Sequence, residues 1–353
     1  MYDSAEGPGA RRFAPKADPL KGKTVLVTGG AGSFGTRFIK TVLERHAPKK
    51  LIVFSRDELK QFNLRQALSE QFPQEKMTLM RFFLGDVRDR DRLELAFRGV
   101  DVVVHAAALK QVPAAEYNPS ECIHTNVLGA ENVVRACLHN RVQKVIALST
   151  DKACSPINLY GATKLASDKV FVAGNNLSGD IGTRFSVVRY GNVAGSSGSV
   201  APFFRKLLED GATELPITDE RMTRFWITLD QGVNFVLSCF ELMRGGEIFV
   251  PKIPASTILD FAHALAPGLA TKVVGIRPGE KLHEAMISVD DARHTVDLGD
   301  RYAIEPAFVE YQRTPFAADG AGKMVAEDFA YTSDLADRLD HAGILELLDA
   351  CRA

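Results

Sequence analysis

The chain has 353 residues, of which 46% are hydrophobic and 25% charged, a composition typical of a folded globular protein rather than a disordered or fibrous one. Lys and Arg number 43 against 44 Asp and Glu, so the formal net charge of −1 disfavours general binding to nucleic acid. Five widely spaced cysteines without a C-x-x-C pair support neither a disulfide framework nor a zinc site, and no metal site is predicted.

The N-terminal residues 1–20 contain Gly, Pro and charged residues but no apolar stretch of signal-peptide length, so we expect a mobile tail. Nowhere in the sequence do 18 apolar residues follow one another, so no membrane-spanning helix is expected. The sequence therefore predicts a soluble protein, with the cytoplasm as its expected location.

After the tail, predicted strands alternate with predicted helices. The strands are short runs rich in β-branched residues: Thr24–Thr28, Leu51–Phe54, Met80–Leu84, Val102–His105, Val145–Leu148, Phe185–Arg189 and Glu247–Val250. Segments with helical spacing lie between them, among them Phe34–Arg45 and Asn126–Asn140. The first strands are nearly continuous apolar runs, the pattern of strands that are buried on both faces. This alternation predicts an α/β protein with a Rossmann-type, doubly wound parallel sheet.

The regular alternation weakens after Asn192. Residues 194–223 are interrupted by Gly, Pro and Ser, and residues 253–353 mix short strands and helices at irregular spacing. We therefore predict a dinucleotide-binding Rossmann domain over residues 21–193, to which residues 224–252 return. The two irregular segments would form a smaller C-terminal substrate-binding lobe.

The first predicted strand runs into a turn with glycines three residues apart, Gly29, Gly32 and Gly35. Such a turn lets the backbone approach a pyrophosphate, and the helix N-terminus at Ser33 and Phe34 supplies amide donors. Because the turn follows the first strand of an α/β chain, it predicts dinucleotide binding.

The residues after the second predicted strand favour NADP over NAD. Arg56 offers a planar fork for a 2′-phosphate, and Ser55 and Lys60 are further donors. Asp57 leaves an alternative open, because its carboxylate could bind the ribose of NAD or cap the following helix. Small or polar residues after the third and fourth strands suit either packing or contacts with the adenine and the nicotinamide ribose. They are Asp86 and Val87 at the adenine, and Ala106 and Ala107 at the ribose.

Tyr160 and Lys164 are four residues apart and so lie on one face of a predicted helix. A phenol normally titrates near pH 10, so it serves as a base at neutral pH only when its anion is stabilised. A lysine ammonium and the positive charge of an oxidised nicotinamide would both stabilise the phenolate. An exposed surface pair is the structural alternative to this proton-transfer site.

Together these motifs resemble the extended short-chain dehydrogenase/reductase superfamily. More narrowly, the chain resembles the inverting UDP-N-acetylglucosamine 4,6-dehydratases that begin pseudaminic acid synthesis, over about Gly22 to Glu284. The matching stretches are VTGGAGSFG, FSRDELKQ, MRFFLGDVRD, HAAALKQVPAAEYNP, ALSTDKACSPINLYGATKLASDK, FSVVRYGNV, ITDERMTRFWIT, GGEIFVPKIP and GIRPGEKLHE. The chain departs from the family at Ser197, where an arginine is usual, in the stretch Tyr331–Ala353 and in its extra N-terminal tail.

The resemblance implies a reaction in three steps. Tyr160 removes the C4 hydroxyl proton while hydride passes to NADP, water is lost across C5 and C6, and hydride returns to C6 with inversion at C5. Lys152 would handle the C5 proton, and Asp151 would assist the departing hydroxyl. Lys152 can act as a base only when neutral, which burial or nearby cations such as Lys110 and Lys164 would promote.

The resemblance also implies a site for UDP-N-acetylglucosamine as the substrate. Arg277 would bind the diphosphate and Glu280 the uridine ribose, while Asn192 would donate to the diphosphate or sugar. Further contacts are expected from Lys110, between cofactor and sugar, and from Val200 to Phe203 as a wall for the uracil. Relatives pair through helices of the Rossmann domain, so a homo-oligomer is expected.

Three alternatives remain open. A UDP-sugar 4-epimerase lacks an Asp-Lys pair after the Ser-Thr of the strand end, and a C5-retaining dehydratase has Asp-Glu there, so Lys152 argues against both. A non-catalytic NADP-binding regulator usually loses the tyrosine or the lysine of the helical pair. This chain keeps Tyr160 and Lys164.

Overall fold

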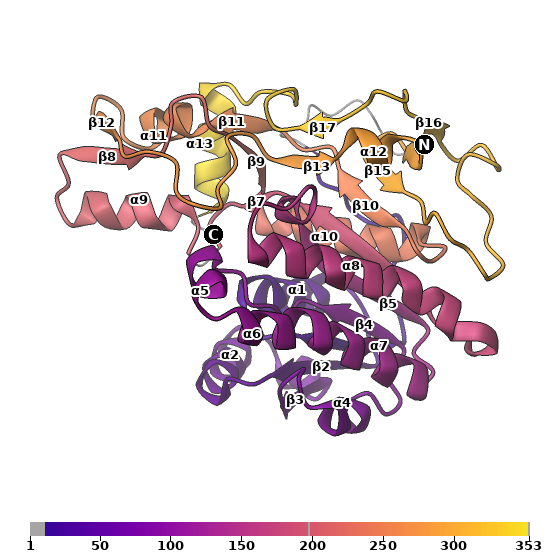
Figure 1. The fold of residues 1–353 in the computed structure, drawn as a ribbon. Helices are drawn as coiled ribbons and strands as arrows, with labels where there is room; N and C mark the ends of the chain where they lie inside the picture. Colours follow the sequence, from indigo (N-terminus) through magenta and orange to yellow (C-terminus); the bar gives the residue numbers. More distant parts are fainter. Residues whose placement is uncertain (1–10, 197, 352–353) are drawn as a thin grey trace.

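The main sheet has ten strands among the residues that the computed structural model describes, 11–196 and 198–351 (Figure 1). Its parallel strands, in spatial order, are β3 (Met80–Leu84), β2 (Lys50–Ser55), β1 (Thr24–Thr28), β4 (Val102–His105), β5 (Lys144–Thr150), β6 (Arg184–Tyr190) and β10 (Ile248–Pro251). Three antiparallel strands continue the sheet beyond β10: β15 (Arg301–Ile304), β14 (Thr295–Asp297) and β16 (Lys323–Met324). The predicted strands are thus found within one or two residues, and the Rossmann-type fold class is confirmed.

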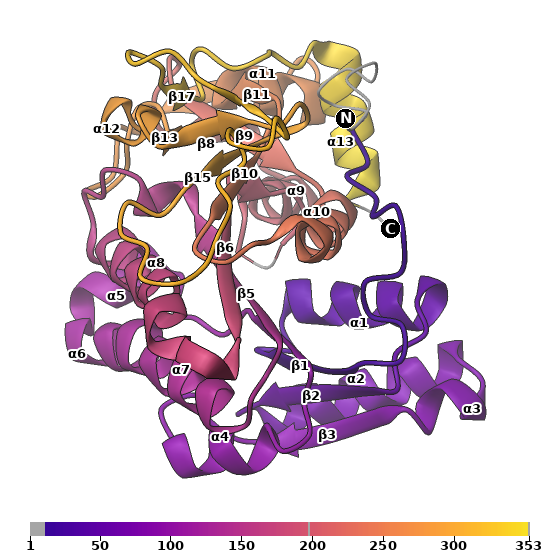
Figure 2. The same cartoon turned by 90° about the vertical axis from the view of Figure 1, so that its right-hand side faces the viewer.

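Helices cover both faces of this sheet, which explains why every residue of β1 and β4 is buried. Helices α1 (Ser33–Arg45) and α10 (Leu229–Leu242) lie on one face, and α7 (Gly129–His139) and α8 (Leu159–Ser178) lie on the other (Figure 2). Arg37 of α1 donates to Asp230 of α10, so the two helices of the first face are also joined by an ion pair.

The other helices and turns of this half of the chain are α2 (Glu58–Gln71), α3 (Gln74–Met77), α4 (Arg90–Ala96), α5 (Val112–Tyr117), α6 (Pro119–Ile123), the π-helical turn η1 (His124–Leu128), and the 3-10 turns η2 (Asp151–Ala153) and η3 (Gly179–Ile181). Within the described ranges, no helix has the length and apolar character needed to cross a membrane.

The second lobe is built from small sheets and helices, and part of it packs around an apolar core of its own. Its strands are β7 (Asn192–Val193), β9 (Thr223–Ile227) and β11 (Ala255–Thr257) in one sheet, β8 (Glu214–Ile217) with β12 (Ala270–Val273), and β13 (Ala285–Ile287) with β17 (Tyr331–Thr332). Its helices are α9 (Val200–Glu209), α11 (Ile258–Leu265), α12 (Val289–Ala292) and α13 (His341–Ala350). Trp226 stacks on Phe261 with 4.5 Å between ring centroids, at the centre of this core.

The structure differs from the predicted domain boundaries in two places. Strand β9, in the predicted segment 224–252, belongs to a small sheet of the second lobe, and part of residues 253–353 belongs to the main sheet. Strands β14, β15 and β16 belong to the main sheet rather than to the smaller lobe. Ile304 of β15 pairs with Ile248 of β10, so the backbone groups at that edge of the parallel sheet are hydrogen-bonded instead of exposed. Short strands without a clear period gave no sign of this pairing in the sequence.

The prediction of a mobile tail is wrong for residues 11–20, which pack along α10; residues 1–10 lie outside the described part. Phe13 is buried and meets Phe235 edge-on, with 5.1 Å between ring centroids. The backbone amides of Lys16 and Ala17 donate to the Glu241 carboxylate at 3.0 and 2.6 Å. An aromatic anchor and these hydrogen bonds outweigh the flexibility that the Gly- and Pro-containing composition suggested.

Candidate active site

A cavity of about 1240 Å³ lies at the carboxyl ends of the parallel strands and is closed on its other side by the second lobe. The strand order reverses between β1 and β4, and ligands of open α/β sheets bind at such a switch point. Single-ligand pockets usually measure about 300–1000 Å³, so this cavity has room for two sizeable ligands.

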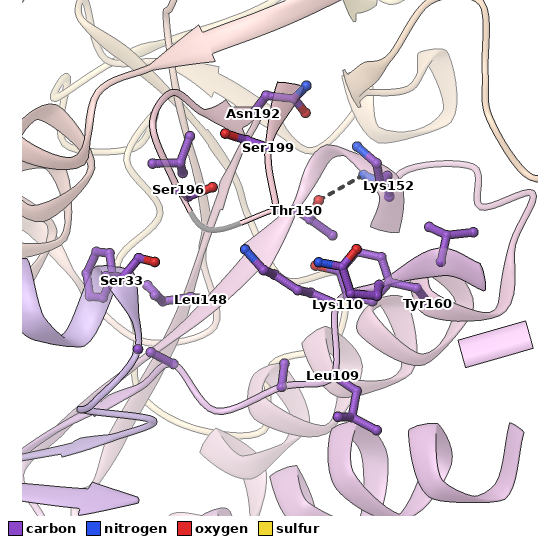
Figure 3. A pocket seen from close by; sticks show the side chains of 18 of the residues that line it. Ser33, Leu109, Lys110, Leu148, Thr150, Lys152, Tyr160, Asn192, Ser196 and Ser199 are labelled. Atoms are coloured by element: carbon purple, nitrogen blue, oxygen red, sulfur yellow. Dashed lines mark hydrogen bonds between the residues drawn. The ribbon is translucent and has the colours of Figure 1, made fainter. Parts of the chain in front are cut away.

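The structure brings the predicted site residues together with one exception. The predicted residues that line the cavity are Gly29, Gly32, Ser33, Phe34, Gly35, Ser55, Arg56, Asp57, Lys60, Asp86, Val87, Ala106, Ala107, Lys110, Lys152, Tyr160, Lys164, Asn192, Val200, Phe203, Arg277 and Glu280. The exception is Asp151, which is fully buried behind Lys152 and does not line the cavity. Figure 3 shows Ser33 on one side of the cavity, and Lys152 and Tyr160 on the other.

The glycine turn leaves room for a ligand's phosphates at the N-terminus of α1. Gly29 has a φ of +65°, and a Cβ there would lie 2.8 Å from the backbone nitrogen of Ala107. Helix α1 begins after Gly32 without a side-chain cap, so its first amides can donate to a ligand. This turn therefore fits the pyrophosphate of a dinucleotide.

Directly after β2, the side chain of Arg56 is 54% exposed, and its Nη1 lies 3.6 Å from Asp86 Oδ2. Asp57 caps α2, because its Oδ1 accepts from the backbone nitrogen of Lys60 at 2.9 Å. That hydrogen bond, with the Lys60 charge, lowers the pKa of Asp57. Of the two roles that the sequence left open for Asp57, the structure shows the helix cap.

Tyr160 and Lys164 lie on the first two turns of α8, whose N-terminus is capped by the Asn158 side chain. Burial raises the pKa of Tyr160 to about 12, although the charge of Lys152 and the hydroxyl of Thr150 oppose the rise. The Lys164 amine donates to the Leu148 carbonyl at 2.7 Å. In this structure the charge of Lys152 also favours the phenolate, an effect that the sequence did not predict.

Lys152 lies in η2, directly after β5, and its amine is held between two carboxylates. Its Nζ is 3.1 Å from Asp151 Oδ1 and 3.2 Å from Glu284 Oε1. Burial alone would lower the pKa of Lys152, but these two negative charges outweigh it and raise the pKa. The expectation that its surroundings promote a neutral amine is therefore wrong for the ligand-free protein.

The remaining predicted residues lie at the end of the cavity formed by the second lobe. Arg277 is 60% exposed, and its Nη1 lies 3.7 Å from Glu280 Oε1. Val200 and Phe203 are on α9, beyond Asn192 of β7. Ser197, where the sequence departs from the family, lies outside the described residues.

The family model for the polysaccharide biosynthesis proteins matches residues 25–306. The chain belongs to this family. The resemblance recognised in the sequence is confirmed by a relative in Campylobacter jejuni, UDP-N-acetylglucosamine 4,6-dehydratase (inverting), which is 56% identical over 334 residues, or 94% of this chain and 97% of the relative. A UDP-glucose 4-epimerase of Rickettsia canadensis is 42% identical over 92% of this chain and 95% of its own.

Solved structures share the fold of this polysaccharide biosynthesis protein. Pen from Bacillus thuringiensis superposes with a TM-score of 0.83 at 31% identity, covering 94% of this chain and 98% of that one. The dTDP-glucose 4,6-dehydratase DesIV from Streptomyces venezuelae, with NAD and TYD bound, superposes with a TM-score of 0.64 at 25% identity, covering 73% and 86%.

Besides Lys206 of α9, the sequence reasoning missed two charged residues of this family member that line the cavity, Arg224 and Glu284. Both fall within stretches that resemble the family, in TRFWIT and GEKLHE, and that likeness is the one signal that could have found them. Both residues are far from Lys152 along the chain, and they lie beside η2 only because β9 and β13 pack there.

Proposed function

We propose that this family member is an inverting UDP-N-acetylglucosamine 4,6-dehydratase, which forms UDP-2-acetamido-2,6-dideoxy-β-L-arabino-hexos-4-ulose. The observation that carries the proposal is the Asp151-Lys152 pair at the end of β5, with the Lys152 amine in the same cavity as Tyr160. The 56% identity to a dehydratase of this specificity supports it.

For the cofactor we propose NADP. The glycine turn fits a dinucleotide, Arg56 is exposed beside it, and the Asp57 carboxylate is already engaged as a helix cap. NAD is bound in the related DesIV dehydratase, so a nicotinamide is the group in common. A bound nicotinamide would accept hydride from C4 of the sugar and return it to C6.

The chain's own groups would move the protons. Tyr160 would accept the proton of the C4 hydroxyl, and Lys152 would exchange a proton with C5. Asp151 Oδ1 accepts hydrogen bonds from the Thr150 hydroxyl at 2.8 Å and from Lys152. Because Asp151 has no surface in the cavity, it would assist loss of the C6 hydroxyl through these two neighbours rather than by direct contact.

The second lobe would hold the UDP group. Arg277 and Asn192 would bind the diphosphate, Glu280 the ribose, and Val200 and Phe203 the uracil. Lys110, at the border of the two halves of the cavity, would contact both the cofactor and the sugar. Burial lowers the pKa of Lys110. A phosphate beside the amine would stabilise its charged form.

The test is to incubate the purified protein with UDP-N-acetylglucosamine in deuterated water and follow the sugar by NMR. We expect a 4-keto-6-deoxy sugar with deuterium at C5 and the L-arabino configuration. Lys152→Ala should bind the UDP-sugar but turn over about 10²–10⁴-fold more slowly, as expected when a positioned acid–base group is lost. Lys49→Ala, an exposed lysine far from the cavity, is the control. Absence of the 4-keto product, or retention at C5, would reject the assignment.

A second candidate is a UDP-sugar 4-epimerase, because relatives with that name are about as long as this chain and 42% identical to it. The same NMR experiment distinguishes the two, since an epimerase keeps the C6 hydroxyl and changes the configuration at C4. UDP-glucose, supplied separately, would then be converted to UDP-galactose.

We also propose that the protein forms a homo-oligomer through the Rossmann half. Tyr117, Ile123 and Leu128, from α5, α6 and η1, are exposed apolar residues on consecutive helical segments, and Tyr117 is 87% exposed. Light scattering on the wild type and on Tyr117→Glu would report the assembly, and a monomeric wild type would reject it.

A further inference from the structure

Glu284 is a buried carboxylate in the active-site cavity that the proposed reaction has not used. Its side chain is 2% exposed, and its Oε1 lies 3.2 Å from Lys152 Nζ. Its other oxygen, Oε2, is buried and has no hydrogen-bond partner in the described part of the chain. A buried carboxylate is costly unless it is paired, so its position beside Lys152 calls for a reason.

The second lobe holds the backbone of Glu284 in place. Its nitrogen donates to the Ser333 hydroxyl at 2.9 Å, and its carbonyl accepts from the Ser333 nitrogen at 2.8 Å. The Ser333 hydroxyl also contacts the Thr223 hydroxyl at 2.6 Å. These bonds tie the start of β13 to β9 and to the turn after β17, so the carboxylate is presented to Lys152 by a rigid part of the lobe.

The charges around Lys152 balance. Asp151 and Glu284 are the two carboxylates at its amine, and Arg224 is the second cation, with its Nε 3.8 Å from Glu284 Oε1. The remaining nitrogens of Arg224 donate to the backbone carbonyls of Thr223, Leu282 and Lys281, so Arg224 is fixed to the lobe. Tyr160 is a neutral titratable group beside them, and the positive charge of Lys152 opposes the rise of its pKa.

Lys152 therefore receives one carboxylate from each half of the molecule. Asp151 is its neighbour in η2, whereas Glu284 reaches it from the lobe that also carries Arg277 and Glu280. Two carboxylates within contact of the amine restrict where it can point and favour its charged form. Removal of one would loosen both restraints.

We propose that Glu284 is a positioning residue that fixes the direction and the charge of the Lys152 amine, and so couples the second lobe to proton transfer at C5. The inference rests on the proposed dehydratase function for its role at C5, but not for its effect on Lys152. The proposal is therefore tested by one measurement that needs no turnover and by one that follows the reaction.

The first measurement is the pKa of Lys152 itself, from the pH dependence of its acetylation by acetic anhydride, followed in the Lys152 peptide by mass spectrometry. In the wild type the amine should titrate above the ordinary lysine value of about 10.4. Glu284→Gln should lower that pKa by about 1–3 units, the usual effect of one adjacent opposite charge. Glu220→Gln, which removes an exposed carboxylate of the same lobe, should leave it unchanged. A Lys152 that titrates at or below the ordinary value in the wild type would overturn the proposal even if the variant did not fold.

The second measurement is the pH profile of dehydration. In Glu284→Gln, the limiting kcat on the plateau of the profile should fall because the amine is held less well. The limb that reports Lys152 should move to lower pH by the same amount as its pKa, with little change in KM. Glu284→Asp keeps the charge and should keep the limb near its wild-type position, with kcat lowered because the shorter side chain holds the amine less well. An unchanged limb in Glu284→Gln would overturn the inference. If no dehydration occurs in the wild type but the acetylation result holds, the proposed function fails while the control of Lys152 by Glu284 stands.

Discussion

Two lysines of the cavity, Lys164 on α8 and Lys152 in η2, have surroundings that shift their pKa values in opposite directions. Burial lowers the pKa of Lys164, although the charge of Asp168 opposes that change. Asp168 is itself committed elsewhere, since it accepts from the Ser149 hydroxyl at 2.8 Å and pairs with Arg189 at 3.4 Å. Lys152, in contrast, has two carboxylates at its amine, and its pKa rises.

The difference shows that contact with carboxylates, rather than burial, sets the direction in which the pKa of a lysine shifts in this site. It also separates two regions. Lys164 and Tyr160 come from one helix and form a local arm of the site, whereas the region around Lys152 is assembled from a strand end and the second lobe. Each of the following changes affects one region, the junction between them, or neither.

The largest effect is expected from Tyr160→Phe, which removes the proton acceptor of the local arm. Reduction of the bound nicotinamide by substrate should slow by about 10²–10⁴-fold, measured by absorbance in a single turnover. In the wild type this step should accelerate as the pH rises, because the required phenolate forms only as the pH approaches a pKa that burial has raised to about 12. Tyr117→Phe on the exposed face is the control. Normal reduction in Tyr160→Phe would assign the proton to another group.

Gly161→Ala should break the junction between the two regions. A Cβ at Gly161 would collide with the Lys152 carbonyl oxygen and lie 3.1 Å from Pro156 Cβ, so η2 has to move away from α8. A shift of this kind misplaces Lys152 relative to Tyr160 and should lower kcat by about 10²-fold. Gly232→Ala on α10 is the matched control, because no atom lies within 4 Å of the added methyl. Equal activities of the two variants would show that close contact of η2 with α8 is dispensable.

Arg56→Ala should leave both lysine regions intact and act on the cofactor alone. Loss of a charged hydrogen bond to the 2′-phosphate should weaken NADP by about 1.5–3 kcal/mol, with little change for NAD. Titration calorimetry with both dinucleotides measures the difference, and Arg98→Ala is an exposed arginine control. If NADP and NAD weaken equally, Arg56 does not read the 2′-phosphate.

The smallest effect is expected from Asp18→Asn, far from the cavity. Asp18 accepts from the backbone nitrogens of Leu20 and Ala47 at 3.0 and 2.8 Å and contacts His46 Nδ1 at 2.8 Å. Burial opposes its ionisation, but these bonds prevail and lower the pKa of Asp18. A lowered pKa contributes stability that is present above the unfolded value of about 3.9 and is lost as the pH falls through the folded value.

The free energy of unfolding in urea should therefore fall by about 1 kcal/mol in Asp18→Asn at pH 7. The gap to the wild type should begin to narrow below about pH 4 and should close as the pH falls through the lowered pKa of Asp18, where the wild-type carboxylate becomes neutral. Turnover per folded molecule should not change. A gap of the same size at every pH would mean that packing rather than charge is responsible.

The sequence by itself determined those features whose parts are neighbours along the chain. The glycine turn from Gly29 to Gly35 follows its strand directly, and Tyr160 and Lys164 share a helix face by their spacing alone. Strands such as β1 and β4 could be predicted because strands covered on both faces are nearly continuous apolar runs. Asp57 was ambiguous because a carboxylate at that place suits a cap and a ribose equally well, and its hydrogen bond to Lys60 became visible only in three dimensions.

Only the tertiary structure decided what depends on contacts between distant segments. Phe13 holds residues 11–20 in place because it is buried against Phe235, and no local sequence pattern predicts this contact. Glu284 meets Lys152 because β13 packs beside η2, and its charge reverses the pKa shift that burial alone would give Lys152. Electrostatic effects depend on distance in space, which spacing along the chain does not reveal between the two halves of a molecule. The sequence was therefore enough to predict Lys152 as the catalytic lysine. The charge of its amine depends on contacts that form only in the fold.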